Sequence, residues 1–106
     1  MTVQDESAAG TGVKNVPEDV LETLALDRAG ALARLTEFLA IPRISTDPAY
    51  HNACLEAASW CAETLRGIGF KASVEPTDGK PMVVARWSTT KDDQPRPYVL
   101  FYGHYD

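Results

Sequence analysis

The 106-residue sequence predicts an α/β fold in which two helices precede three strands of a mixed sheet. Through the first two thirds of the chain, apolar residues recur at steps of three and four, the spacing of amphipathic helices. After residue 69 that spacing changes to two, as in strands. A nearly continuous apolar run at residues 98–102 indicates a last strand that is buried on both faces, in the middle of a sheet.

The two predicted helices have start and stop signals. Pro17 followed by two acidic residues begins the first, which is expected to kink or divide at residues 27–30 and to stop before Pro42. Asp47 and Pro48 are the expected N-cap and first residue of the second. Its apolar stripe ends near Gly69, the expected left-handed cap. The stripe is Cys54, Ala57, Ala58, Cys61, Leu65 and Ile68.

The strands and loops follow from the change of period. Residues 70–75 and 82–87 are expected to pair as an antiparallel hairpin around a turn at 76–79, and a polar loop at 88–97 leads to the strand at 98–102. Residues 1–15 are polar and small, which predicts a disordered tail. Residues 16–106 are expected to form the structured region.

Charge and composition exclude some classes of partner. The net charge is −5 and the basic residues are scattered, so we expect neither nucleic acid nor an anionic membrane as partner. The N-terminal residues lack the basic start and apolar run of a secretory signal, which predicts a cytoplasmic protein. Cys54 and Cys61 lie about 10 Å apart along one helix, too far to pair with each other.

The candidate functional residues follow the last predicted strand, where open α/β sheets collect their functional groups. His104 offers an imidazole, a common zinc ligand, and the carboxylate of Asp106 can hold the second ring nitrogen of such a histidine. Taken alone, a His-x-Asp pattern is more often structural. Trp60 and Trp87 are expected to pack in the fold, with a substrate pocket as the alternative.

Residues 98–106 resemble the strand and first metal motif of the co-catalytic zinc peptidases, the family of carnosine dipeptidases, aminoacylases and desuccinylases. Residues 38–45, 62–70 and 81–87 are similar, in the same order, to the segment after that family's first helix, the end of its second helix and its second strand. The resemblance implies a zinc-exopeptidase-like mixed sheet, present only in part. It covers the chain from about residue 20 onward.

The resemblance also implies a function. His104 would bind one of two zinc ions, and Asp106 would orient His104. The full-length protein would be a metal-dependent hydrolase that cleaves small peptides or N-acyl amino acids, and it would be able to form a homodimer. A bridging Asp, a Glu acting as general base and the other ligands are expected downstream. The chain is thus expected to be truncated after its first metal motif and inactive alone.

Two alternatives stay open. The chain can be a short non-catalytic binding or assembly module whose open sheet edge is covered by partner strands. It can also be an independent small hydrolase with a site formed by His104, Asp106 and His51. The peptidase hypothesis itself predicts that the last strand exposes apolar residues, because its neighbours in the sheet are missing.

Overall fold

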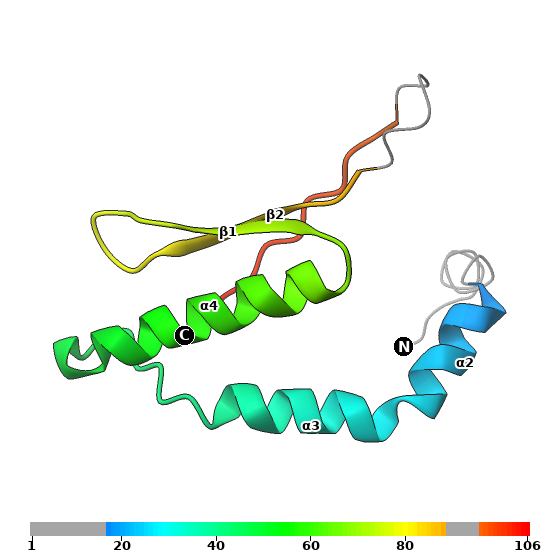
Figure 1. The fold of residues 1–106 in the computed structure, drawn as a ribbon, viewed down its shortest axis with the longest axis horizontal. Helices are drawn as coiled ribbons and strands as arrows, with labels where there is room; N and C mark the ends of the chain where they lie inside the picture. The colour runs from blue at the N-terminus through cyan, green and yellow to red at the C-terminus, as the bar shows by residue number, and fades with distance from the viewer. Residues whose placement is uncertain (1–16, 89–95) are drawn as a thin grey trace, which may run out of the picture. The chain divides into compact units, whose positions relative to one another are not determined.

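The computed structural model describes residues 17–88 and 96–106. The predicted tail at residues 1–15 and most of the predicted polar loop, residues 89–95, lie outside the described residues. The chain divides into two compact units, Met1–Thr36 and Glu37–Asp106. Its helices and strands are shown in Figure 1.

The first predicted helix forms as two helices, α2 (Glu18–Leu26) and α3 (Arg28–Leu39), which confirms the expected division. Asp27 lies at the break. Its N–H donates to Thr23 O, its own carbonyl accepts from Ala31, and its carboxylate accepts from Arg34 at 2.8 Å. The two backbone bonds satisfy groups at the break between the helices, and the bond from Arg34 links the Asp27 side chain to α3. Neither helix contains a buried residue.

The second predicted helix is α4 (His51–Gly67), preceded by a 3₁₀ turn, Pro48–Tyr50. The Asp47 carboxylate accepts from the Ala49 N–H at 2.9 Å, which confirms Asp47 as the N-cap of this turn. At the other end Gly69 has a φ of 103°, the positive value expected of a glycine cap. Both ends of the element were therefore set by local sequence signals.

The buried face of α4 consists of small side chains. They are Cys54, Ala57, Ala58 and Ala62, each fully buried. The first three belong to the predicted stripe. Ile68 was placed in that stripe wrongly: it follows the end of the helix and is 67% exposed.

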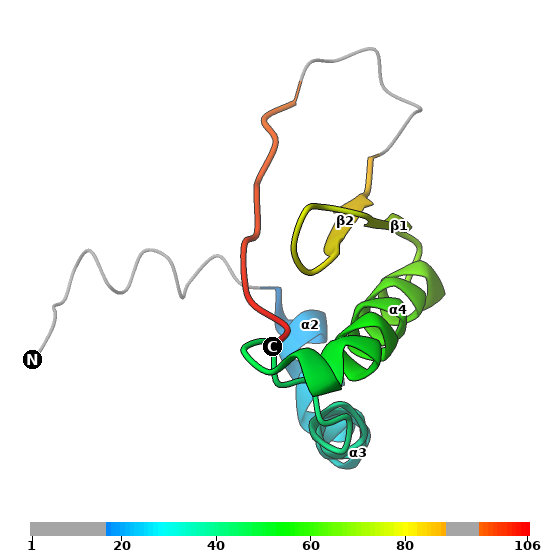
Figure 2. The same cartoon turned by 90° about the vertical axis from the view of Figure 1, so that its left-hand side faces the viewer.

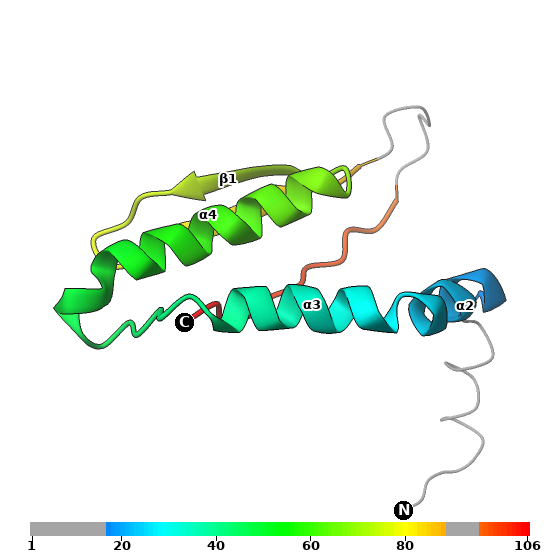
Figure 3. The same cartoon turned by 60° about the horizontal axis from the view of Figure 1, so that its bottom comes forward.

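Two antiparallel strands, β1 (Lys71–Glu75) and β2 (Met82–Arg86), form the predicted hairpin. The pairs Ala72↔Ala85 and Val74↔Val83 are half-buried, and both strands pack on α4. Figures 1 and 2 show the hairpin lying along α4, and Figure 3 shows the same packing from another side. Small residues on the helix allow this close approach of helix and sheet.

The third predicted strand is not confirmed. Residues 98–102 are assigned to no strand, and the sheet of the described residues has two antiparallel strands instead of a mixed arrangement. Residues 98–102 are 76–90% exposed. A strand is defined by hydrogen bonds to a neighbour, and no described strand pairs with this segment. The described fold is thus a small α/β unit of helices and one hairpin.

Candidate functional site

The two residues singled out from the sequence lie together. His104 Nδ1 is 3.4 Å from Asp106 Oδ1, within ion-pair range but longer than a well-formed hydrogen bond. Both side chains reach solvent, with 72% of His104 and 39% of Asp106 exposed. When Nδ1–H points at a carboxylate, the Nε2 lone pair is left free to bind a ligand.

The second oxygen of Asp106 is held by a residue from the other end of the unit. The hydroxyl of Ser45 donates to Asp106 Oδ2 at 2.5 Å. This bond is the largest cause that lowers the pKa of Asp106 below its usual value, followed by the backbone N–H of Asp106 itself; the charge of His104 also lowers it. Asp106 is thus held in its ionised form, which is the form that can accept a hydrogen bond from His104.

Tyr105, between the two candidate residues, points into the fold. Its hydroxyl donates to the carbonyl of Pro81 at 2.6 Å, immediately before β2 begins. Burial raises the pKa of Tyr105, and nearby Cys54, Asp106 and Cys61 raise it further. This hydrogen bond and the partial burial of Tyr105 give it a packing role.

Ser45 lies in the loop between α3 and α4, and Arg43 fixes the start of that loop through hydrogen bonds. Arg43 Nη1 donates to the carbonyls of Phe38 and Ile41, each at 3.1 Å. The guanidinium also lies 4.0 Å from the centre of the Phe38 ring, a cation–π contact. The Phe38 ring stacks on Trp60 of α4, with ring centres 5.0 Å apart, so the expected packing role of Trp60 is confirmed.

Because Nδ1 faces Asp106, a metal would have to bind at Nε2 of His104. Tyr102 Oη is 3.5 Å from His104 Nε2, and the two rings meet edge to face at 5.6 Å. A metal at Nε2 would require the Tyr102 hydroxyl to turn aside, which its 82% exposure allows. The described residues therefore fit the resemblance for one histidine ligand and one orienting carboxylate. Catalytic zinc uses about three protein ligands.

The alternative site with His51 gains no support. His51 begins α4, is exposed, and its Nδ1 lies 3.2 Å from the amine of Lys80. Cys54, one turn further on, is fully buried, as expected of a core residue. Within residues 17–88 and 96–106, no three His, Cys, Asp or Glu side chains form a group that could hold a metal ion.

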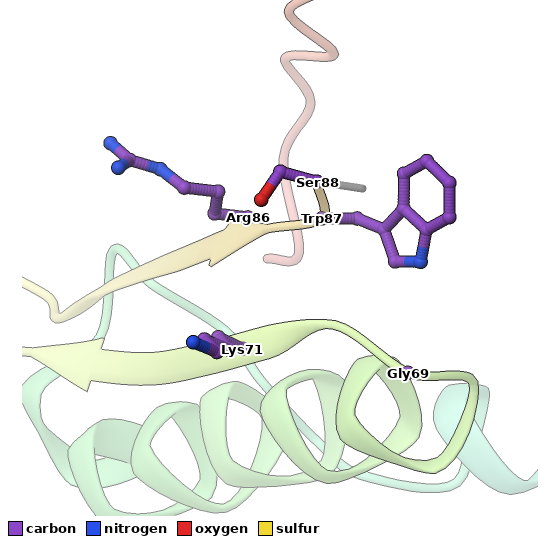
Figure 4. A pocket seen from close by; sticks show the side chains of 5 residues that line it. All are labelled: Gly69, Lys71, Arg86, Trp87 and Ser88. Carbon is purple, nitrogen blue, oxygen red and sulfur yellow. The ribbon is translucent and has the colours of Figure 1, made fainter. Parts of the chain in front are cut away.

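Two surface pockets lie away from His104 and Asp106. One, of about 300 Å³, is lined by Gly69, Lys71, Arg86, Trp87 and Ser88. Figure 4 shows Lys71 and Arg86 on the neighbouring strands and Trp87 beyond the end of β2. Trp87 is 56% exposed, so the expected packing of this tryptophan is not observed. The other pocket lies between the start of α4 and the hairpin loop.

Sequence reasoning missed the site role of Ser45 and Arg43. Both residues belong to the family-like segment at residues 38–45, which the sequence analysis treated only as a whole. No local pattern connects either residue with Asp106, because the contact joins positions 61 residues apart. The one available signal was the family-like segment at residues 38–45, which precedes the second predicted helix but does not include its N-cap.

No family model, curated protein or solved structure matches this chain. In the part of the chain that the structure describes, no helix has both the length and the apolar character needed to cross a membrane.

Proposed function

We propose that this chain supplies one zinc ligand, His104, and its orienting carboxylate, Asp106, to a metal-dependent hydrolase that cleaves dipeptide-like or N-acyl amide bonds. The observation that carries the proposal is the pairing of His104 Nδ1 with Asp106 Oδ1 at 3.4 Å. Histidines that bind metals commonly donate their other ring N–H to a carboxylate in this way. The resemblance of four chain segments to the zinc peptidases supports the choice of metal and reaction.

Each residue has a defined task in this proposal. Asp106 holds the proton on Nδ1 of His104, which keeps the Nε2 lone pair available and limits rotation of the ring. The side chain of His104 is 72% exposed, and the Tyr102 hydroxyl lies 3.5 Å from its Nε2. When bound, a zinc pair would act as a Lewis acid toward the amide carbonyl and would lower the pKa of a coordinated water. Further ligands and the general base would come from other residues of the full-length protein.

The test uses the full-length protein and three variants, at His104, Asp106 and His51. His104→Ala should lower the zinc content measured by elemental mass spectrometry and abolish hydrolysis of dipeptides and N-acyl amino acids. Asp106→Asn should lower metal affinity or activity by about 10–100-fold, as is typical for a partner of a metal ligand. His51→Ala is the control, since that side chain contacts Lys80 instead. Unchanged zinc content in His104→Ala would refute the proposal.

A non-catalytic binding module is the second candidate. The exposed apolar segment at residues 98–102 favours it, because an extended chain with apolar side chains can add to the sheet of a partner. The same exposure is expected if the neighbouring strands of a larger sheet are missing. A binding module would retain its partner in His104→Ala, whereas the hydrolase would lose its activity.

A further inference from the structure

We propose that Ser45 is a positioning residue for His104, acting through Asp106, and that Arg43 holds Ser45 in place. This inference rests on the proposed function, because it concerns the same histidine. It adds that the orientation of His104 is set by the loop between α3 and α4.

The argument starts from the two oxygens of Asp106. Oδ2 accepts the Ser45 hydroxyl at 2.5 Å, while Oδ1 faces His104 Nδ1 at 3.4 Å. A carboxylate held at only one oxygen can still turn about its side-chain bonds. The bond from Ser45 removes that freedom, because hydrogen bonds to an ionised carboxylate are short and strong. With Oδ2 held, Oδ1 is directed at the imidazole.

Ser45 can act in this way only if its own loop is held. Arg43 provides the anchor: it donates to the carbonyl of Phe38 at the end of α3 and to that of Ile41 in the loop, and it contacts the Phe38 ring. Phe38 in turn stacks on Trp60 of α4. Ser45 is therefore connected through packed side chains to the helix that supports the hairpin. This connection is independent of residues 98–102, which pair with neither of the described strands.

Tyr105 provides a second point of attachment for the same segment. Its hydroxyl donates to Pro81 O at 2.6 Å, and Pro81 is buried next to the start of β2. The backbone on both sides of Tyr105 is thus tied to the hairpin, while Asp106 is tied to the loop before α4. In Figure 2 the red C-terminal segment runs to that loop. His104 directly precedes two residues that are attached to separate parts of one unit.

The experiment measures the imidazole of His104 directly in the 106-residue chain, without metal. Nitrogen-15 NMR distinguishes the two neutral tautomers at a pH where the ring is unprotonated. The wild type should favour the form with the proton on Nδ1. Ser45→Ala should shift the population toward the other form, and Ser45→Thr, which keeps the hydroxyl, should restore it. Circular dichroism checks that each variant retains its helices.

The matched control is Ser73→Ala. The Ser73 hydroxyl also donates to a carboxylate, that of Glu75 at 2.7 Å, but this pair lies on the hairpin and touches neither His104 nor Asp106. Ser73→Ala should therefore leave the tautomer populations of His104 unchanged. Equal populations in wild type and Ser45→Ala would overturn the inference, as would equal shifts in the two alanine variants.

The zinc affinity of the full-length protein is a separate readout. Ser45→Ala should weaken it by about tenfold, the low end of the range for residues behind a metal ligand, because Ser45 lies one step further out than Asp106. If His104→Ala keeps its zinc, the proposed function fails. The tautomer measurement, which is made without metal, still tests whether Ser45 orients His104. If zinc affinity is lost only in His104→Ala, Ser45 has no positioning role.

Discussion

The Ser45 hydroxyl donates to Asp106 Oδ2 at 2.5 Å although 61 residues separate the two in sequence. This bond favours the ionised carboxylate, and it is the main reason why the pKa of Asp106 lies below its usual value of 3.8. A lowered pKa in the folded state means that the contact stabilises the fold above that usual value. The stabilisation is lost as the pH falls through the lowered pKa.

We therefore expect the side-chain Cγ of Asp106 to titrate below pH 3.8 in carbon-13 NMR of the wild type. In Ser45→Ala the midpoint should rise toward 3.8, because the largest cause of the shift has been removed. The Ser73→Ala variant should titrate like the wild type. Identical midpoints in Ser45→Ala and the wild type would show that this hydrogen bond does not form in solution.

Replacement of Gly69 by alanine should destabilise the fold. Gly69 has a φ of 103°, a conformation that residues with a Cβ rarely adopt, whereas a Cβ there would meet only Trp87 ring atoms at 3.9 Å. The cost is therefore one of backbone strain, about 1–2 kcal/mol in the free energy of unfolding by urea.

Gly67→Ala is the matched control for that glycine. Gly67 is the last residue of α4 and has no heavy atom within 4 Å of an added Cβ. Alanine there should stabilise the helix, by no more than about 1 kcal/mol. If both variants changed stability in the same direction, the positive φ of Gly69 would not be the cause.

Two like charges face each other in the hairpin, and reversing one should stabilise it. Lys71 of β1 is directly opposite Arg86 of β2, an unfavourable cross-strand pair. Arg86→Glu should raise the free energy of unfolding by about 0.2–1 kcal/mol. Arg86→Gln, which removes the repulsion without adding attraction, should give a smaller gain. High salt should reduce the difference between the two variants.

The two cysteines should differ in reactivity toward iodoacetamide. Cys54 is fully buried and should react only when the chain unfolds. Cys61 is half-buried, and burial raises the pKa of its thiol, partly offset by the charge of Arg43. Less thiolate is present at pH 8 than for a free cysteine, so Cys61 should react slowly.

Variants with only one of the two cysteines assign a rate of reaction with iodoacetamide to each thiol. In denaturant the rates of Cys54 and Cys61 should become equal. Equal rates for native and denatured Cys61 would contradict the burial of this thiol.

The exposed apolar segment should cause self-association of the 106-residue chain. Residues 98–102 are 76–90% exposed and form no ladder with a described strand. An exposed apolar segment of this kind can pair edge to edge with a second copy of the chain. Sedimentation velocity should show concentration-dependent association that Leu100→Lys suppresses. Met82→Lys, the same change at another exposed apolar residue, should have little effect; a wild type that remains monomeric would refute this prediction.

The elements with clear local signals were predicted well from the sequence. As expected, the helical segment that contains α4 begins after Asp47 and ends before Gly69. The change of apolar spacing predicted the hairpin close to its observed limits. These features depend on backbone preferences and on side chains a few residues apart, which any window of sequence contains. The division at Asp27 was foreseen for the same reason.

Tertiary structure alone decided the rest. The pattern of residues 98–102 favours a strand, but a strand needs a neighbour, and none of the described strands provides one. Sequence analysis selected His104 and Asp106, yet the support of Asp106 by Ser45 became visible only when distant parts of the chain met. The physical reason is range: caps and periodicity act within a few residues, whereas pairing and site geometry depend on partners that sequence separation does not identify.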